Sequence, residues 1–172
     1  RLISKHADAT LYPQALYHRA HMHFLHGRGP AAIEDSERFL KEFPRLPMAA
    51  DVLLWLGDFH EATGKAEAAE KHYLGVVTSH PELPQARVAL YRAARSAFRR
   101  EELERATVLL AQLREMPGGE DVPRILGEAA MLHGDVLATQ GRFEAAMIQF
   151  KRAEEFVDEP RFQMSAAGRV GD

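Results

Sequence analysis

Small residues recur in this sequence at nearly equal intervals. Two series of alanines and glycines share the same three spacings of 37, 37 and 40 residues. The two series are Ala32, Ala69, Ala106 and Ala146, and Ala20, Gly57, Ala94 and Gly134. Fixed periods of about 20 to 50 residues are typical of proteins that stack one structural unit many times. The register therefore predicts a repeat protein.

Each repeat has the pattern of two helices joined by a tight turn. In the second repeat, apolar residues at helical spacing begin at Val52 and end at Gly64, and a second helix is expected from about Ala66 to Pro81. The third repeat has Glu101 where the turn glycine stands in the others. We expect an all-α, right-handed superhelical solenoid of antiparallel helix hairpins, in which Gly57 lies opposite Ala69 and allows close helix packing.

The spacing also sets the expected domain limits. We expect one domain over residues 1–172, cut from a longer array. Residues 1–8 would end a preceding repeat and residues 160–172 would begin a fifth. The helix hairpins between them are expected over 12–44, 47–81, 84–117 and 122–158.

Composition excludes several classes of function. The formal net charge is -3 with interspersed signs, which gives no field that would gather nucleic acid. No stretch has the roughly 18 apolar residues of a membrane span, so no direct membrane insertion is expected. The sequence has no cysteine and no phosphate loop, serine-hydrolase elbow or zinc-protease motif. We therefore expect no enzyme activity and no cofactor.

Four histidines close together raise the alternative of a metal site. On a helix at about 100° per residue, His18 and His21 lie about 60° apart, whereas His23 lies about 140° from His18 on the other side. At most a two-histidine site would result, so surface or packing roles are favoured over a metal site. The fourth member, His26, does not change this expectation.

The second repeat resembles the tetratricopeptide repeat family. Leucine, Leu-Gly, alanine, aromatic and proline positions stand at the family's intervals at Leu53, Leu56, Gly57, Ala69, Tyr73 and Pro81. The 37-residue form, with Ala-Leu-Tyr opening two repeats, is similar to repeats of bacterial cell-envelope proteins of the outer-membrane assembly lipoprotein and Tol-Pal coordinator type. That resemblance favours the periplasm or cell envelope over the cytoplasm.

The resemblance also implies a function. In this family the first helices of successive hairpins line a concave groove that receives a peptide or helix of a partner protein. By register, the groove residues here would be Tyr17, His21, Phe24, Asp58, Glu61, Tyr91, Arg95, Phe98, Arg99, Glu128, Met131 and Asp135. Arg95 and Arg99 are the candidates for holding an acidic segment. The family's carboxylate clamp is disfavoured, because its lysine and asparagine positions carry other residues.

Three alternatives stay open. Several aromatic residues, Tyr17 and Tyr91 above all, could seal one hairpin against the next instead of binding a partner. The segment could be a structural spacer or a self-assembly module that associates through exposed repeat ends. It could also be a regulatory region of an enzyme whose catalytic domain lies elsewhere.

Overall fold

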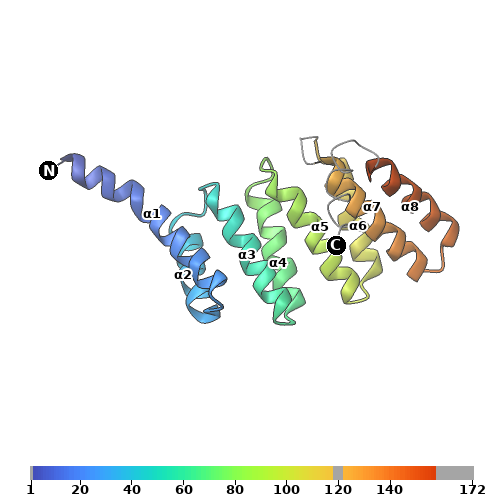
Figure 1. Ribbon diagram of the computed structural model, residues 1–172, viewed down its shortest axis with the longest axis horizontal. Helices are drawn as coiled ribbons and strands as arrows, with labels where there is room; N and C mark the ends of the chain where they lie inside the picture. Colours follow the sequence, from blue (N-terminus) through green and yellow to red (C-terminus); the bar gives the residue numbers. More distant parts are fainter. Residues whose placement is uncertain (1, 118–121, 158–172) are drawn as a thin grey trace, which may run out of the picture. The chain divides into compact units, whose positions relative to one another are not determined.

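The computed structural model describes residues 2–117 and 122–157, and within them every regular element is an α-helix (Figure 1). The helices are α1 (Leu2–Leu25), α2 (Gly29–Glu42), α3 (Met48–Ala62), α4 (Ala66–Ser79), α5 (Gln85–Arg99), α6 (Leu103–Glu115), α7 (Val122–Thr139) and α8 (Phe143–Val157). This confirms the predicted all-α repeat of helix hairpins. The chain divides into two compact units, Arg1–Ala89 and Leu90–Asp172, with the boundary inside α5.

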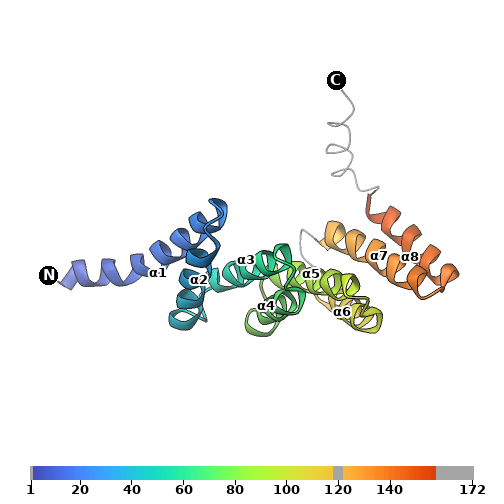
Figure 2. The same cartoon turned by 90° about the horizontal axis from the view of Figure 1, so that it is seen from below.

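Consecutive helices pack as antiparallel pairs. Figures 1 and 2 show α1 beside α2, α3 beside α4, and α7 beside α8, and each of these pairs is in extensive contact. In the first unit, α3 also contacts α1 and α2. A hairpin therefore buries one surface internally and another against its neighbour, as expected for stacked repeats.

The four hairpin turns within the described residues share one backbone conformation. The second residue after each first helix has a positive φ: 67° at Gly27, 76° at Gly64, 61° at Glu101 and 74° at Gly141. The amide of the next residue then donates to a carbonyl five residues earlier, as from Lys65 to His60 at 2.8 Å. This is the Schellman motif, which glycine favours because it has no Cβ. Glu101 adopts it as well, so the third hairpin forms without the glycine.

The first helix differs from the expected boundaries. The spacing predicts the end of a preceding repeat over 1–8 and a new hairpin from residue 12, but α1 runs unbroken from Leu2 to Leu25 with Pro13 inside it. No glycine separates the two stretches, and Pro13 removes only one intrahelical hydrogen bond. The expected fifth repeat over 160–172 lies outside the described residues.

Glycines allow an aromatic ring to cross two of the described hairpins. A Cβ built on Gly57 would collide with the ring of Tyr73, and one built on Gly134 would collide with the ring of Phe150. Small residues thus lie where the helices approach, as predicted. The atoms nearest to a Cβ at Gly57 belong to Tyr73 of α4, however. Ala69, which was expected opposite Gly57, is fully buried on α4 four residues before Tyr73.

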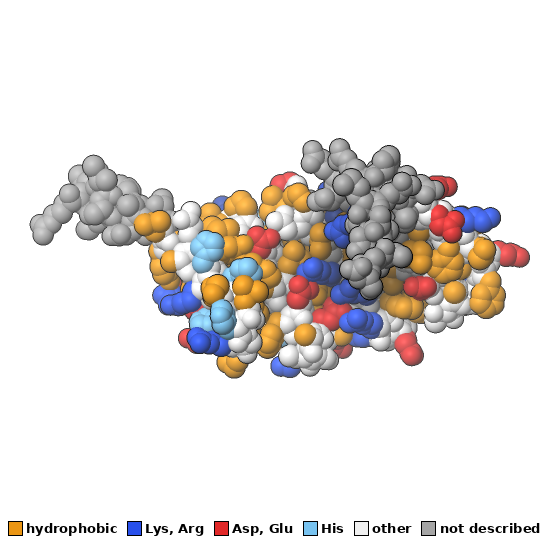
Figure 3. All heavy atoms as spheres, viewed as in Figure 1, with side chains coloured by type: hydrophobic (Ala, Val, Ile, Leu, Met, Phe, Trp, Pro, Cys, Tyr) orange, Lys and Arg blue, Asp and Glu red, His pale blue; other side chains and the backbone are white. Residues whose placement is uncertain are grey.

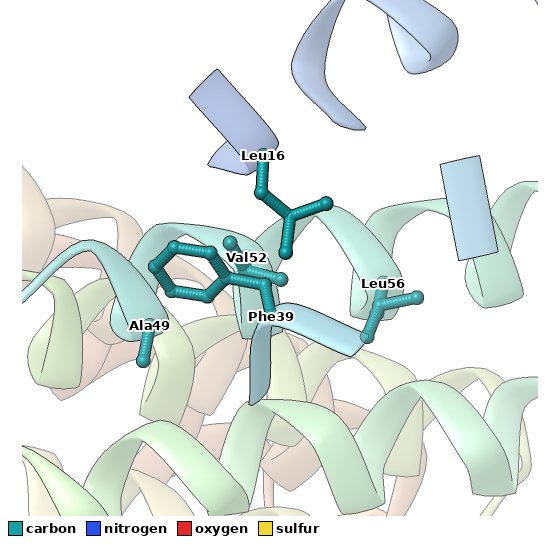
Figure 4. Packing of buried hydrophobic residues seen from close by; sticks show 5 residues of the cluster. All are labelled: Leu16, Phe39, Ala49, Val52 and Leu56. Carbon is teal, nitrogen blue, oxygen red and sulfur yellow. The ribbon is translucent and has the colours of Figure 1, made fainter. Parts of the chain in front are cut away.

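A core cluster joins the first three helices. Leu16 of α1, Phe39 of α2 and three residues of α3 converge in Figure 4. The α3 members are Ala49, Val52 and Leu56, and none of the five is more than 2% exposed. Because one cluster includes side chains from three helices, α1 and α2 are fixed against the next hairpin by apolar burial.

Candidate functional site

Three predicted groove residues of α1 lie against one tryptophan of α3. His21 stacks on Trp55 with ring centroids 4.4 Å apart and an interplanar angle of 9°. Tyr17 lies 4.9 Å and Phe24 lies 6.2 Å from the same ring. Phe24 also approaches Phe59, at 6.0 Å. These contacts favour the interpretation that the aromatic residues of α1 seal the junction between two hairpins.

The tyrosine of this cluster is also fixed by a polar contact. The Tyr17 hydroxyl donates to a carboxylate oxygen of Asp51 at 3.2 Å, and the Gln85 side-chain amide donates to the other oxygen at 3.0 Å. Burial first, and then the Asp51 carboxylate, raise the pKa of Tyr17 to about 12. Asp51 therefore links α1, α3 and the first residue of α5, which supports the sealing role of Tyr17.

Sequence reasoning missed Asp51 and Trp55. Both lie on the same stripe of α3 as Phe59, at intervals of four residues. That stripe is next to the one on which Asp58 and Glu61 were placed. The sequence signal for this contact was the series Asp51, Trp55 and Phe59 at helical spacing, which faces the aromatic residues of α1.

The predicted carboxylates of α3 share one hydrogen-bond donor. The buried Tyr73 hydroxyl of α4 lies 2.9 Å from an oxygen of Asp58 and 3.1 Å from an oxygen of Glu61. Burial and these two acidic neighbours raise the pKa of Tyr73, so the hydroxyl keeps its proton for donation. The two carboxylates are thus oriented by the partner helix of their own hairpin.

In the second unit, predicted residues of α5 and α7 form a mixed cluster. The Arg95 guanidinium lies 5.9 Å from the ring centroid of Tyr91, within cation–π range. Burial and the charge of Glu128 raise the pKa of Tyr91, while Arg95 and Arg124 oppose that rise. Arg124 donates to Glu128 at 2.6 Å. An aromatic ring, two guanidinium groups and a carboxylate therefore lie within electrostatic reach of one another.

The remaining predicted residues of this unit vary in accessibility. Phe98 is half-buried and Arg99 is exposed on α5. On α7, Met131 is 48% exposed and Asp135 is exposed. Met131 also lines a cavity of about 270 Å³ between α7 and α8, together with Glu128. The α7 members are therefore open to solvent.

The histidines of α1 make separate contacts. His21 stacks on Trp55, His23 approaches Asp35 at 3.7 Å, and His26 contacts the Met22 carbonyl at 2.8 Å. Figure 3 shows the pale-blue histidines on the surface of this hairpin. Across residues 2–117 and 122–157, no three His, Cys, Asp or Glu side chains lie together as metal ligands would.

Two other histidines, one on α3 and one on α4, stack on each other. The rings of His60 and His72 stack at 5.1 Å with an interplanar angle of 5°. Burial lowers the pKa of both, and the neighbouring Lys65 and Lys71 add to the effect. The folded hairpin therefore favours two neutral imidazoles.

This pair predicts acid sensitivity of the first unit. A folded-state pKa below the ordinary value means that the unfolded chain binds more protons, so the contribution to stability is present above the unfolded pKa and is lost as pH falls through the folded pKa. Lowering the pH from about 7.5 to about 5.5 should reduce Tm more in the wild type than in His72→Gln. Thermal unfolding followed by circular dichroism measures this. An equal reduction in both proteins would contradict the assignment.

Comparisons with known proteins agree with the fold. Residues 17–84 match a family described as tetratricopeptide repeat. The structure is similar to the crystal structure of BtubC (BKLC) from P. vanneervenii, with a TM-score of 0.71 and 18% sequence identity, over 95% of this chain and 67% of that chain. No curated protein matches the chain. None of the described helices is both long and apolar enough to cross a membrane. The chain thus folds as a tetratricopeptide-type array of helix hairpins, and residues 17–84 match the sequence pattern of that repeat family.

Proposed function

We propose that this chain is a protein interaction scaffold that binds a peptide or helix of a partner protein along the α5 and α7 surface. The observation that carries the proposal is the cluster of Tyr91, Arg95 and Glu128 on the first helices of two successive hairpins. Rigid aromatic area supplies binding energy, while charges of both signs set the register of a partner. The tetratricopeptide fold supports protein binding as the general role.

The predicted groove residues of the first unit are more engaged in packing. Its aromatic residues Tyr17, His21 and Phe24 already contact Trp55, and part of their area is used to hold α1 on α3. In the second unit, Arg99 and Met131 are exposed beside the Tyr91 cluster on their own helices. Partner contacts are therefore proposed mainly for α5 and α7.

Replacing Arg95 and Phe98 together by alanine should abolish partner capture while leaving helicity unchanged. Loss of an anchoring aromatic or arginine commonly costs about 2 kcal/mol or more of binding free energy. Quantitative pull-down from the source organism, with wild-type and variant proteins as paired baits, measures the effect for each captured protein. Circular dichroism and light scattering establish that the variant keeps its helices and its oligomeric state.

A matched control removes the same side-chain types elsewhere. Arg45 is exposed before α3, and Phe143 is 68% exposed at the start of α8. The Arg45→Ala/Phe143→Ala variant should capture the partner as the wild type does. Undiminished capture by the Arg95 and Phe98 variant would show that the α5 and α7 surface is not the binding site.

A further inference from the structure

A second cavity lies between α6, α7 and α8, away from the surface proposed above. Its volume is about 240 Å³, and its apolar lining includes Leu110, Leu126, Ala130 and Phe156. The α7 residues that line it follow the spacing 126, 129, 130 and 133. Residues 128, 131 and 135 lie two positions further along the helix, which rotates them by about 200°. The cavity and the proposed α5 and α7 surface therefore use opposite sides of α7.

The repeat register shows how the α7 side of this cavity differs from the first unit. Val52, Leu53 and Leu56 of α3 stand 77 residues before Ala129, Ala130 and His133 of α7. In the first unit, Val52 and Leu56 are fully buried, and Leu53 reaches across to α4. The second unit thus has two alanines and a histidine where the first unit has large aliphatic side chains.

The neighbouring helices α6 and α8 also differ from their counterparts in the first unit. Leu113 and Arg114 of α6 stand 74 residues after Phe39 and Leu40 of α2. On α8, Arg152 stands 77 residues after Gly75. The cavity thus combines smaller side chains on α7 with cationic side chains on α6 and α8, while Leu110, Leu126 and Phe156 replace the smaller Ser36, Ala49 and Ser79.

The rim of the cavity carries positive charge. His133 has its pKa lowered by burial first, and then by Arg114, Arg142 and Arg152, against a hydrogen bond with Gln149. Arg114 has a weak contact with Glu115 at 3.4 Å, and Arg152 forms no ion pair within the described part of the chain. Several guanidinium groups thus act on one apolar cavity, and an anion at the rim would be stabilised there.

We propose that this cavity is a second docking site, which receives an aliphatic side chain of a partner protein and an adjacent acidic side chain. The aliphatic group fills the space lined by Leu110, Leu126 and Ala130, and the carboxylate meets Arg114 and Arg152. Charge complementarity selects the acidic residue, and the apolar lining of the cavity selects its aliphatic neighbour. This inference goes beyond the proposed function and does not depend on it.

The direct test is an NMR titration of the ¹⁵N-labelled full chain with two blocked peptides. One is acetyl-Ala-Leu-Glu-Ala-amide, and the other has glutamine in place of glutamate. We expect amide shifts in α6, α7 and α8 around Ala130, with about tenfold weaker binding of the glutamine peptide. Equal affinities, or the absence of shifts in these helices, would overturn the proposal.

Two variants separate the aliphatic and acidic parts of the site. Ala130→Leu restores the residue of the first unit and should abolish the shifts from both peptides. Arg152→Gln should reduce the affinity for the glutamate peptide to that for the glutamine peptide. The neighbouring Lys151→Gln, on the exposed side of α8, is the matched control and should change neither affinity.

The source of the carboxylate is tested in the same titration. Free 4-methylpentanoate offers the same aliphatic and anionic groups without a peptide backbone. Binding of this acid at least as tight as that of the glutamate peptide would show a small-molecule site and overturn the protein-docking proposal. Because none of these measurements involves Arg95 or Phe98, failure here leaves the proposed function standing, and the reverse also holds.

Discussion

Replacing Phe39 by alanine should lower the free energy of unfolding of the first unit by about 3 to 5 kcal/mol. The side chain is fully buried in the cluster that joins α1, α2 and α3. Its ring also lies 6.1 Å from that of Tyr17 and 5.6 Å from that of Phe43. Alanine would remove the transfer free energy of the ring and leave a cavity among three helices. Urea unfolding followed by circular dichroism measures the loss.

Hydrogen exchange locates this effect and supplies its control. Amides of α1 to α3 should exchange faster in Phe39→Ala, because the cluster spans those helices. The comparison variant is Ile148→Ala, whose side chain is 64% exposed on α8, and it should change stability by less than about 0.5 kcal/mol. A loss below about 1 kcal/mol in Phe39→Ala would show that the three helices do not share this core.

The hairpin architecture could be read from the sequence because its signals are local. The turn position with positive φ stands two residues after the first helix of each described hairpin, and glycine occupies it in three of the four. Glu101 is instructive, because its left-handed conformation costs roughly 1 to 2 kcal/mol relative to glycine and yet forms. Burial of apolar side chains on both flanking helices, such as Leu90 of α5 and Leu109 of α6, offsets that cost. The sequence pattern predicted the position of the turn but not how much the packing of the flanking helices stabilises it.

The contacts of the candidate site were harder to predict, since they depend on pairs far apart in the chain. The Asp51 contacts with Tyr17 and Gln85 each span 34 residues. The register placed Tyr17 on a groove face, but a period alone does not distinguish a free aromatic ring from one stacked against Trp55. Side-chain rotamers and the lateral offset of neighbouring helices decide that question, and neither is encoded in a spacing.

Replacing Gly57 by alanine should destabilise the first unit by about 2 kcal/mol, although alanine is the better helix former. The new methyl group would meet the Tyr73 ring. That ring is fully buried, and its hydroxyl is held by Asp58 and Glu61, so it has no open space to enter. Overpacking of about 3 kcal/mol is then offset by roughly 1 kcal/mol of helix propensity. Urea unfolding of the variant and the wild type measures the difference.

A second glycine of the same hairpin gives the matched control. A Cβ on Gly75 of α4 would lie 3.4 Å from Leu53, an ordinary contact, so Gly75→Ala should stabilise by about 0.5 to 1 kcal/mol. The same glycine-to-alanine substitution is thus expected to lower the free energy of unfolding at Gly57 and to raise it at Gly75. Helix propensity alone cannot produce these opposite effects. In the background of Tyr73→Leu, Gly57→Ala should lose its cost, because the ring that it strikes is gone. An unchanged cost in that background would mean that another contact, and not the crossing of the Tyr73 ring, requires glycine at this position.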